Sequence, residues 1–203
     1  TGTSMSTQSL PRIVIVSPAL AAANNGNWHT AHRWSRLLRH DYRVSLVARW
    51  RGPADGEADA LIALHARRSA DSIDAFSRAH PARPLVVVLT GTDLYRDIRV
   101  DADAQRSLRQ ATRLVVLQEQ GPQELAPALR AKCSVLFQSA TPLAPAAKPA
   151  SRLNVVMAGH LRAEKDPLVF MQAVRRLAGR PELRFEHIGD ALEPAFAEAA
   201  RQT

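Results

Sequence analysis

A short polar stretch after an apolar run is the first place in this chain where chemistry could occur: Thr90-Gly91-Thr92-Asp93. The five residues before it, 85–89, are aliphatic and mostly β-branched, which is typical of a strand buried on both faces of a sheet. In open α/β sheets, ligands bind outside the carboxyl ends of the strands. Gly91 lets the backbone approach a ligand, the hydroxyls donate and accept hydrogen bonds, and Arg96 supplies a positive charge for an anion. A plain polar turn with Asp93 capping a helix explains this loop equally well.

Polar residues also follow other predicted strands. Asn24-Asn25-Gly26-Asn27 comes between the strand 12–16 and a helix that contains Thr30, and His65, Arg67 and Arg68 follow the strand 58–64. Because parallel strands end at one edge of a sheet, we expect these loops to line one cleft. Predicted anion-binding residues are Asn24, Gly26, Asn27, Thr30, Arg67, Thr90, Gly91, Thr92 and Arg96. The alternative interpretation is that an asparagine only caps the helix and that the arginines only face solvent.

A second charged turn occupies residues 159–167, directly after the apolar run 153–158. Arg162 and Lys165 are three residues apart at the start of a predicted helix, where both could face a diphosphate. The alternative is an exposed turn in which Glu164 pairs with Lys165, a pairing that contributes little to stability.

Composition excludes several classes of protein. No apolar run approaches the roughly 20 residues that a membrane-spanning helix needs, and Cys133, the only cysteine, excludes an internal disulfide and a cysteine metal site. We therefore expect a reducing, cytoplasmic setting. His29 and His32 have helical spacing, but no acidic residue completes a metal site, so we predict none. The net charge of +8 is almost all arginine and is scattered along the chain, which favours an anionic small substrate over a nucleic acid.

Short apolar runs alternate with helical segments, which predicts a doubly wound parallel α/β sheet. The predicted strands are 12–16, 42–47, 58–64, 85–89, 113–117, 132–137, 153–158 and 183–188. The predicted helices are 28–39, 70–78, 103–110, 118–130 after a Gly-Pro kink, 168–178 and 192–200. Residues 1–11 are interpreted as a vector-derived tag and a disordered leader. Residues 12–140 form a first domain, 141–152 a proline-containing linker, and 153–203 the beginning of a second domain. Two strands cannot bury both faces of a sheet, so we expect much of that second domain to be missing and this length of chain to be inactive.

Two doubly wound domains, an Asn/Gly turn after the first strand and the turn Gly-x-Leu-x-x-Glu-Lys at 159–165 resemble the GT-B glycosyltransferases of the glycogen-synthase-like group, family 4. The resemblance implies two Rossmann-like domains, the first binding the acceptor and the second the nucleotide sugar. It places donor-diphosphate contacts on Gly159, His160, Arg162 and Lys165, with His160 where the family usually has arginine. It implies no cofactor and no divalent metal.

Within that group, the strings NNGNWHTAHRW, ALHARRS, LTGTDLYRD, LVVLQ, QSA and GHLRAEKDP are similar to the selenosugar synthases of selenoneine biosynthesis. This resemblance covers residues 11–189. It implies that the selenium of selenophosphate attacks the anomeric carbon of UDP-N-acetylglucosamine or UDP-glucose, and that UDP and phosphate are released. Such a nucleophile is already deprotonated, so orientation and stabilisation of the leaving diphosphate would carry most of the rate.

Two other functions are compatible with the sequence. A glycosyltransferase with a hydroxyl acceptor would need a general base, for which Asp93 and His65 are the candidates. A non-catalytic module that binds anions or nucleic acid would show steep salt dependence and no transfer activity.

Overall fold

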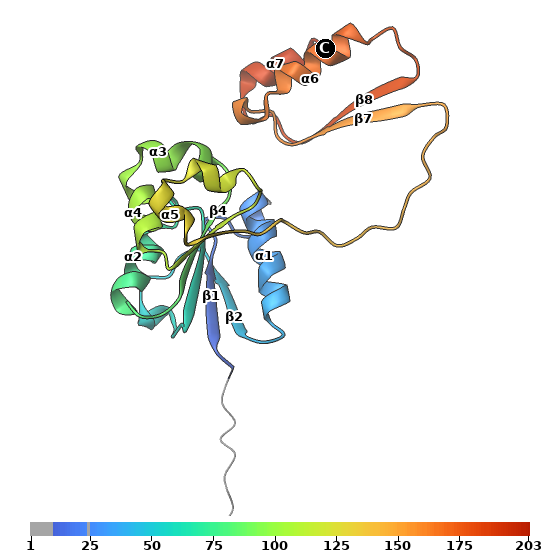
Figure 1. The fold of residues 1–203 in the computed structure, drawn as a ribbon. Coiled ribbons are helices and arrows are strands. Elements are labelled where there is room, and N and C mark those ends of the chain that lie inside the picture. The colour runs from blue at the N-terminus through green and yellow to red at the C-terminus, as the bar shows by residue number, and fades with distance from the viewer. Residues whose placement is uncertain (1–9, 24) are drawn as a thin grey trace, which may run out of the picture. The chain divides into compact units, whose positions relative to one another are not determined.

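The computed structural model describes residues 10–23 and 25–203, and it divides the chain into two units, Thr1–Ala140 and Thr141–Thr203. Figure 1 shows one sheet in each unit, with helices packed against it. Among the described residues, no helix combines the length and the apolar character needed to cross a membrane.

The first unit is built on a six-stranded sheet with the order β2-β1-β3-β4-β5-β6, in which every neighbouring pair is parallel. This is the α/β architecture expected from the sequence, and it is Rossmann-like. The strands are β1 (Arg12–Val16), β2 (Arg43–Val47), β3 (Ala60–Leu64), β4 (Leu85–Leu89), β5 (Arg113–Val116) and β6 (Cys133–Val135).

The sheet buries a different set of side chains on each face because strand residues alternate between the faces. Ile13 and Ile15 face helix α1 (Gly26–Leu38), and the buried cluster there includes Ala31. Val14 and Val16 belong to the larger core on the opposite face. Helices α2 (Ala70–Ala79) and α4 (Ala102–Gln110) cover that face, and Trp50 packs edge-on against Phe76 within it.

The order in which successive strands are added to the sheet reverses between β1 and β3, and the candidate site lies at this point. The connection after β1 runs through α1 on one face, and the connection after β3 runs through α2 on the other. Ligand sites of open α/β sheets lie at such a switch point, outside the carboxyl ends of the strands. Val16 pairs with Ala63, and Leu64 with Val88, so β1, β3 and β4 end at the same edge.

Local structure after β4 and β5 differs from the sequence expectation. The sequence predicts that residues 118–130 are helical after a Gly-Pro kink, but they form a 3-10 turn, η4 (Gly121–Glu124), and a single helical turn, α5 (Pro127–Arg130). Pro122 and Pro127 lack the N–H that a continuous helix needs, which explains the break. After β4, the predicted polar loop forms a π-helical turn, η3 (Asp93–Asp97), followed by the short α3 (Ile98–Val100).

The second unit pairs β7 (Leu153–Ala158) in parallel with β8 (Leu183–Ile188). The turn η5 (Ala163–Lys165) and helix α6 (Pro167–Arg176) connect the two strands, and α7 (Pro194–Arg201) follows β8. Phe170 of α6 packs edge-on against Phe185 of β8, and α7 contacts α6, so the helices cover one face of this sheet. Val156 and Ile188 on the other face are 48% and 56% exposed.

Candidate functional site

The loops after β3 and β4 are joined by the carboxylate of Asp93, which is fully buried. Its Oδ1 accepts hydrogen bonds from the backbone N–H groups of Thr90 and Gly91, both at 2.9 Å, and its Oδ2 accepts one from Ala66 N at 2.9 Å. Gly91 has φ +145°, a backbone conformation that other residues rarely adopt. Asp93 therefore fixes the shape of both loops.

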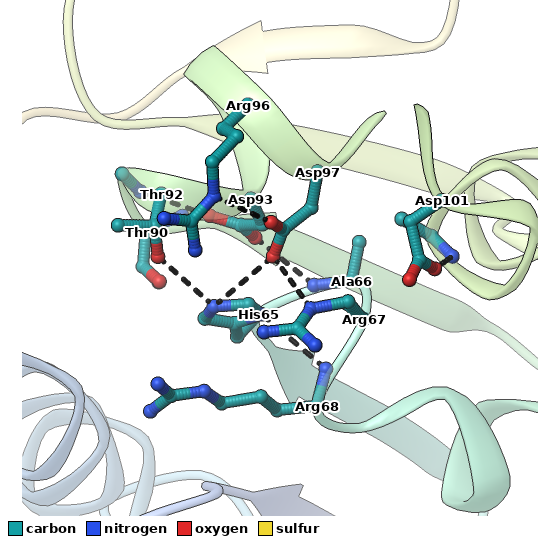
Figure 2. A network of polar contacts seen from close by, with 12 residues as sticks. His65, Ala66, Arg67, Arg68, Thr90, Thr92, Asp93, Arg96, Asp97 and Asp101 are labelled. Atoms are coloured by element: carbon teal, nitrogen blue, oxygen red, sulfur yellow. Dashed lines mark hydrogen bonds and ion pairs between the residues drawn. The ribbon is translucent and has the colours of Figure 1, made fainter. Parts of the chain in front are cut away.

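A second buried carboxylate, Asp97, orients two arginines (Figure 2). Its Oδ2 accepts from Arg67 Nε at 2.8 Å and its Oδ1 from Arg96 Nε at 3.0 Å. The Asp97 side chain is only 6% exposed, whereas the side chains of Arg67 and Arg96 are 40% and 57% exposed. Burial opposes ionisation of Asp97, but the hydrogen bonds and charges of the two arginines outweigh it and hold its pKa below the ordinary value. The hydrogen bond to Asp97 in turn raises the pKa of Arg67.

His65 lies in the loop after β3 and contacts Thr92 in the loop after β4. Its side chain is buried, and its backbone lies in the left-handed region at φ 71°, which is uncommon for a residue other than glycine. Nδ1 accepts a hydrogen bond from Arg68 N at 3.3 Å, so the proton of the neutral ring is on Nε2, which lies 3.2 Å from Thr92 Oγ1 and 3.9 Å from Asp97 Oδ2.

The surroundings of His65 favour that neutral ring. Burial lowers its pKa most strongly, and the cations Arg68 and Arg67 lower it further, whereas Asp93 and Asp97 act in the opposite direction. The net effect is a pKa below the ordinary 6.5.

We call this group of residues the edge cluster: His65, Arg67, Thr90, Gly91, Thr92, Asp93, Arg96 and Asp97. Figure 2 shows side chains from the loops after β3 and β4 that point toward one another, with His65 and Arg67 on one side and Thr92, Arg96 and Asp97 on the other. Two guanidinium groups and two half-buried threonines supply hydrogen-bond donors, and both acidic side chains are turned inward as acceptors for protein donors. Such an arrangement can bind a tetrahedral oxyanion.

The loop after β1 begins helix α1 and contacts the segment after β6. Asn25 caps α1, because its side chain accepts from Trp28 N. The Thr30 hydroxyl is buried; it donates to Gly26 O at 2.9 Å and accepts from Gln138 Nε2 at 3.0 Å. Thr30 thus ties the segment after β6 to α1, and its hydroxyl is already engaged within the protein.

The other predicted residues of this loop are placed as follows. Gly26 is exposed and Asn27 is half-buried in the first turn of α1. Asn24 lies outside the described residues.

In the second unit, the predicted diphosphate residues lie in the loop after β7. Gly159 O is 2.7 Å from His187 Nε2, and His160 Nδ1 accepts from Asp190 N at 3.0 Å. Lys165 is exposed at the end of η5, directly before α6. Arg162 Nε is buried without a hydrogen bond among the described residues, and it lies 3.9 Å from Glu164 Oε2. The loop therefore presents cationic side chains next to the start of a helix.

Sequence reasoning missed Asp97, the residue that organises the arginines. The signal was its spacing from Asp93: residues four apart on a helical turn share a face. An aspartate beside Arg96 in a chain rich in arginine gave no other sign that it would be buried.

No protein-family model matches the chain, and no curated protein matches it. Among the described residues, no group of three or more histidine, cysteine and acidic side chains is arranged to hold a metal ion. Fold and site together define the class: a Rossmann-like α/β protein with a cationic, hydroxyl-bearing cluster at the carboxyl edge of its parallel sheet.

Proposed function

We propose that the protein is a GT-B glycosyltransferase that transfers a sugar from UDP-N-acetylglucosamine or UDP-glucose to selenophosphate. The observation that carries this proposal is the pair Arg67 and Arg96, both oriented by the buried Asp97 at the switch-point edge of the sheet. The sequence resemblance supplies the identity of the substrates. The edge cluster supplies a binding place for a small tetrahedral anion.

The reaction balances without a cofactor. A lone pair on selenium forms the bond to the anomeric carbon, and the bond from that carbon to the β-phosphate oxygen breaks, so that UDP leaves with the electron pair. Water then attacks phosphorus, the phosphorus–selenium bond breaks, and phosphate and the selenosugar are released. Arg67, Arg96 and Thr92 would hold the phosphoryl oxygens of the acceptor while selenium attacks.

The state of the acidic residues favours an anionic nucleophile over a hydroxyl acceptor. A hydroxyl acceptor needs a general base with an accessible lone pair. Both oxygens of Asp93 accept backbone N–H groups, Asp97 binds two arginines, and the unprotonated nitrogen of His65 accepts from Arg68 N. Selenophosphate brings its own negative charge and needs no such base.

We assign binding of the leaving diphosphate to residues of the second unit. Lys165 and Arg162, with the backbone of Gly159 and His160, would contact the diphosphate next to the start of α6. Cations there stabilise the charge that develops on UDP as the glycosidic bond breaks.

The test is an acceptor competition followed by mass spectrometry. A protein that carries the complete second domain is incubated under anaerobic conditions with each UDP-sugar and with either selenophosphate or an alcohol acceptor, and UDP and sugar products are measured. We expect UDP and a selenium-containing sugar only with selenophosphate. Release of UDP with the alcohol and none with selenophosphate would rule the proposal out.

A further inference from the structure

The direction in which the Thr92 hydroxyl donates its hydrogen bond depends on His65. Because His65 Nε2, which carries the ring proton, lies 3.2 Å from Thr92 Oγ1, that oxygen accepts a hydrogen bond. Its own proton must then point elsewhere, and among the described residues no acceptor takes it. Thr92 is half-buried beside Arg96, whose Nε binds Asp97.

We propose that His65 is a positioning residue that directs the Thr92 hydroxyl proton outward, so that Thr92 is a fixed donor to an oxyanion bound by Arg67 and Arg96. A hydroxyl normally donates or accepts as its partner requires. With its proton directed outward, Thr92 favours a ligand that presents an acceptor, such as a phosphoryl oxygen. The inference rests on the proposed oxyanion site, but not on the sugar donor or on selenium.

The two ring nitrogens of His65 have separable functions. Nδ1 accepts from Arg68 N just before α2, which is a structural contact, and Nε2 faces Thr92, which is the positioning contact. Asparagine places a polar atom near the position of Nδ1 and tolerates positive φ, whereas glutamine reaches the position of Nε2. The variants His65→Asn and His65→Gln therefore test one contact each.

The first measurement is nitrogen NMR of the histidine side chains in the 203-residue protein. We expect His65 to be the neutral ring with its proton on Nε2. A neutral ring with its proton on Nδ1 would overturn the proposal, because Nε2 would then accept from Thr92 and turn its hydroxyl inward.

The second measurement is the affinity for inorganic phosphate, followed by NMR titration. We expect Thr92→Val and His65→Asn to weaken phosphate binding about tenfold each, the loss of one hydrogen bond to a charged ligand. Thr92→Ser and His65→Gln should recover part of the affinity. The double variant His65→Asn, Thr92→Val should bind no more weakly than Thr92→Val alone, because both changes remove the same donor. His40→Gln, in the exposed turn after α1, is the control.

The outcomes separate this inference from the proposed function. Phosphate binding that is unchanged in a folded His65→Asn, or that is weakened additively in the double variant, overturns the positioning role. Wild-type protein that binds no phosphate overturns the oxyanion site and the positioning role together. Phosphate binding with the expected pattern, but without sugar transfer to selenophosphate by a protein that carries the complete second domain, contradicts the proposed function alone.

Discussion

Asp97 contributes to stability as well as to the orientation of the arginines. Replacing it with asparagine removes the charged acceptor that Arg67 and Arg96 share. We expect Asp97→Asn to lower the free energy of unfolding by about 1–2 kcal/mol, toward the low end because solvent screens both guanidiniums.

Asp103→Asn is the matched control, because Asp103 pairs with Arg106 on the surface of α4. Its effect should lie within about 0.5 kcal/mol. Denaturant unfolding followed by tryptophan fluorescence measures both variants, since Trp28, Trp34 and Trp50 all lie in the first unit. Equal stabilities for the two variants would contradict the assigned role of Asp97.

His65 makes the stability of the first unit depend on pH. Its folded-state pKa lies below 6.5, so in mildly acidic solution the unfolded chain binds this proton more readily than the folded protein does. Stability therefore falls as the pH decreases below about 6.5 and is fully present above it. Thermal melting between pH 8 and pH 5 should show this loss, and His65→Asn should reduce the slope while His40→Gln leaves it unchanged. A slope that is the same in all three proteins would show that His65 is not responsible.

At the scale of the elements, close backbone packing determines the loop after β7. A Cβ added at Gly189 would lie 2.2 Å from Gly159 O, and Gly189 has φ +148°. We expect Gly189→Ala to displace this loop and to destabilise the second unit by about 1–3 kcal/mol. Amide NMR of the loops at 159–162 and 189–191 measures the displacement.

Gly179→Ala provides the control for that prediction. An added Cβ at Gly179 meets no heavy atom within 4 Å, so this variant should keep the wild-type spectrum apart from its immediate neighbours. If both alanine variants leave the loop after β7 unchanged, the close contact with Gly159 does not constrain it.

Local sequence patterns predicted several strands, but not the contacts between the loops of the candidate site. The runs 12–16, 85–89, 153–158 and 183–188 coincide with β1, β4, β7 and β8, because continuous or alternating apolar residues define strands locally. The buried partners of Thr30 and Asp97 could not be predicted, since Gln138 and Arg67 come from distant parts of the chain. Those contacts depend on the strand order, which local patterns do not specify.

At the scale of the whole molecule, the two units differ in how completely they bury their sheets. Helices cover both faces of the six-stranded sheet, whereas α6 and α7 cover one face of β7–β8. We expect residues 10–140 to fold alone with a single cooperative transition in tryptophan fluorescence, and residues 141–203 alone to be marginally stable at best. A non-cooperative transition for residues 10–140 would show that this unit depends on the rest of the chain.

The edge cluster as an acceptor site is the central claim, and calorimetric titration of the protein with selenophosphate under anaerobic conditions tests it most directly. The comparison uses the wild type, Arg67→Gln and, as a matched control, Arg106→Gln on the surface of α4. We predict binding to one site, weakened at least about tenfold in Arg67→Gln by the loss of a charged donor and unchanged in Arg106→Gln. No binding by the wild type, or equal binding by all three proteins, would contradict the account.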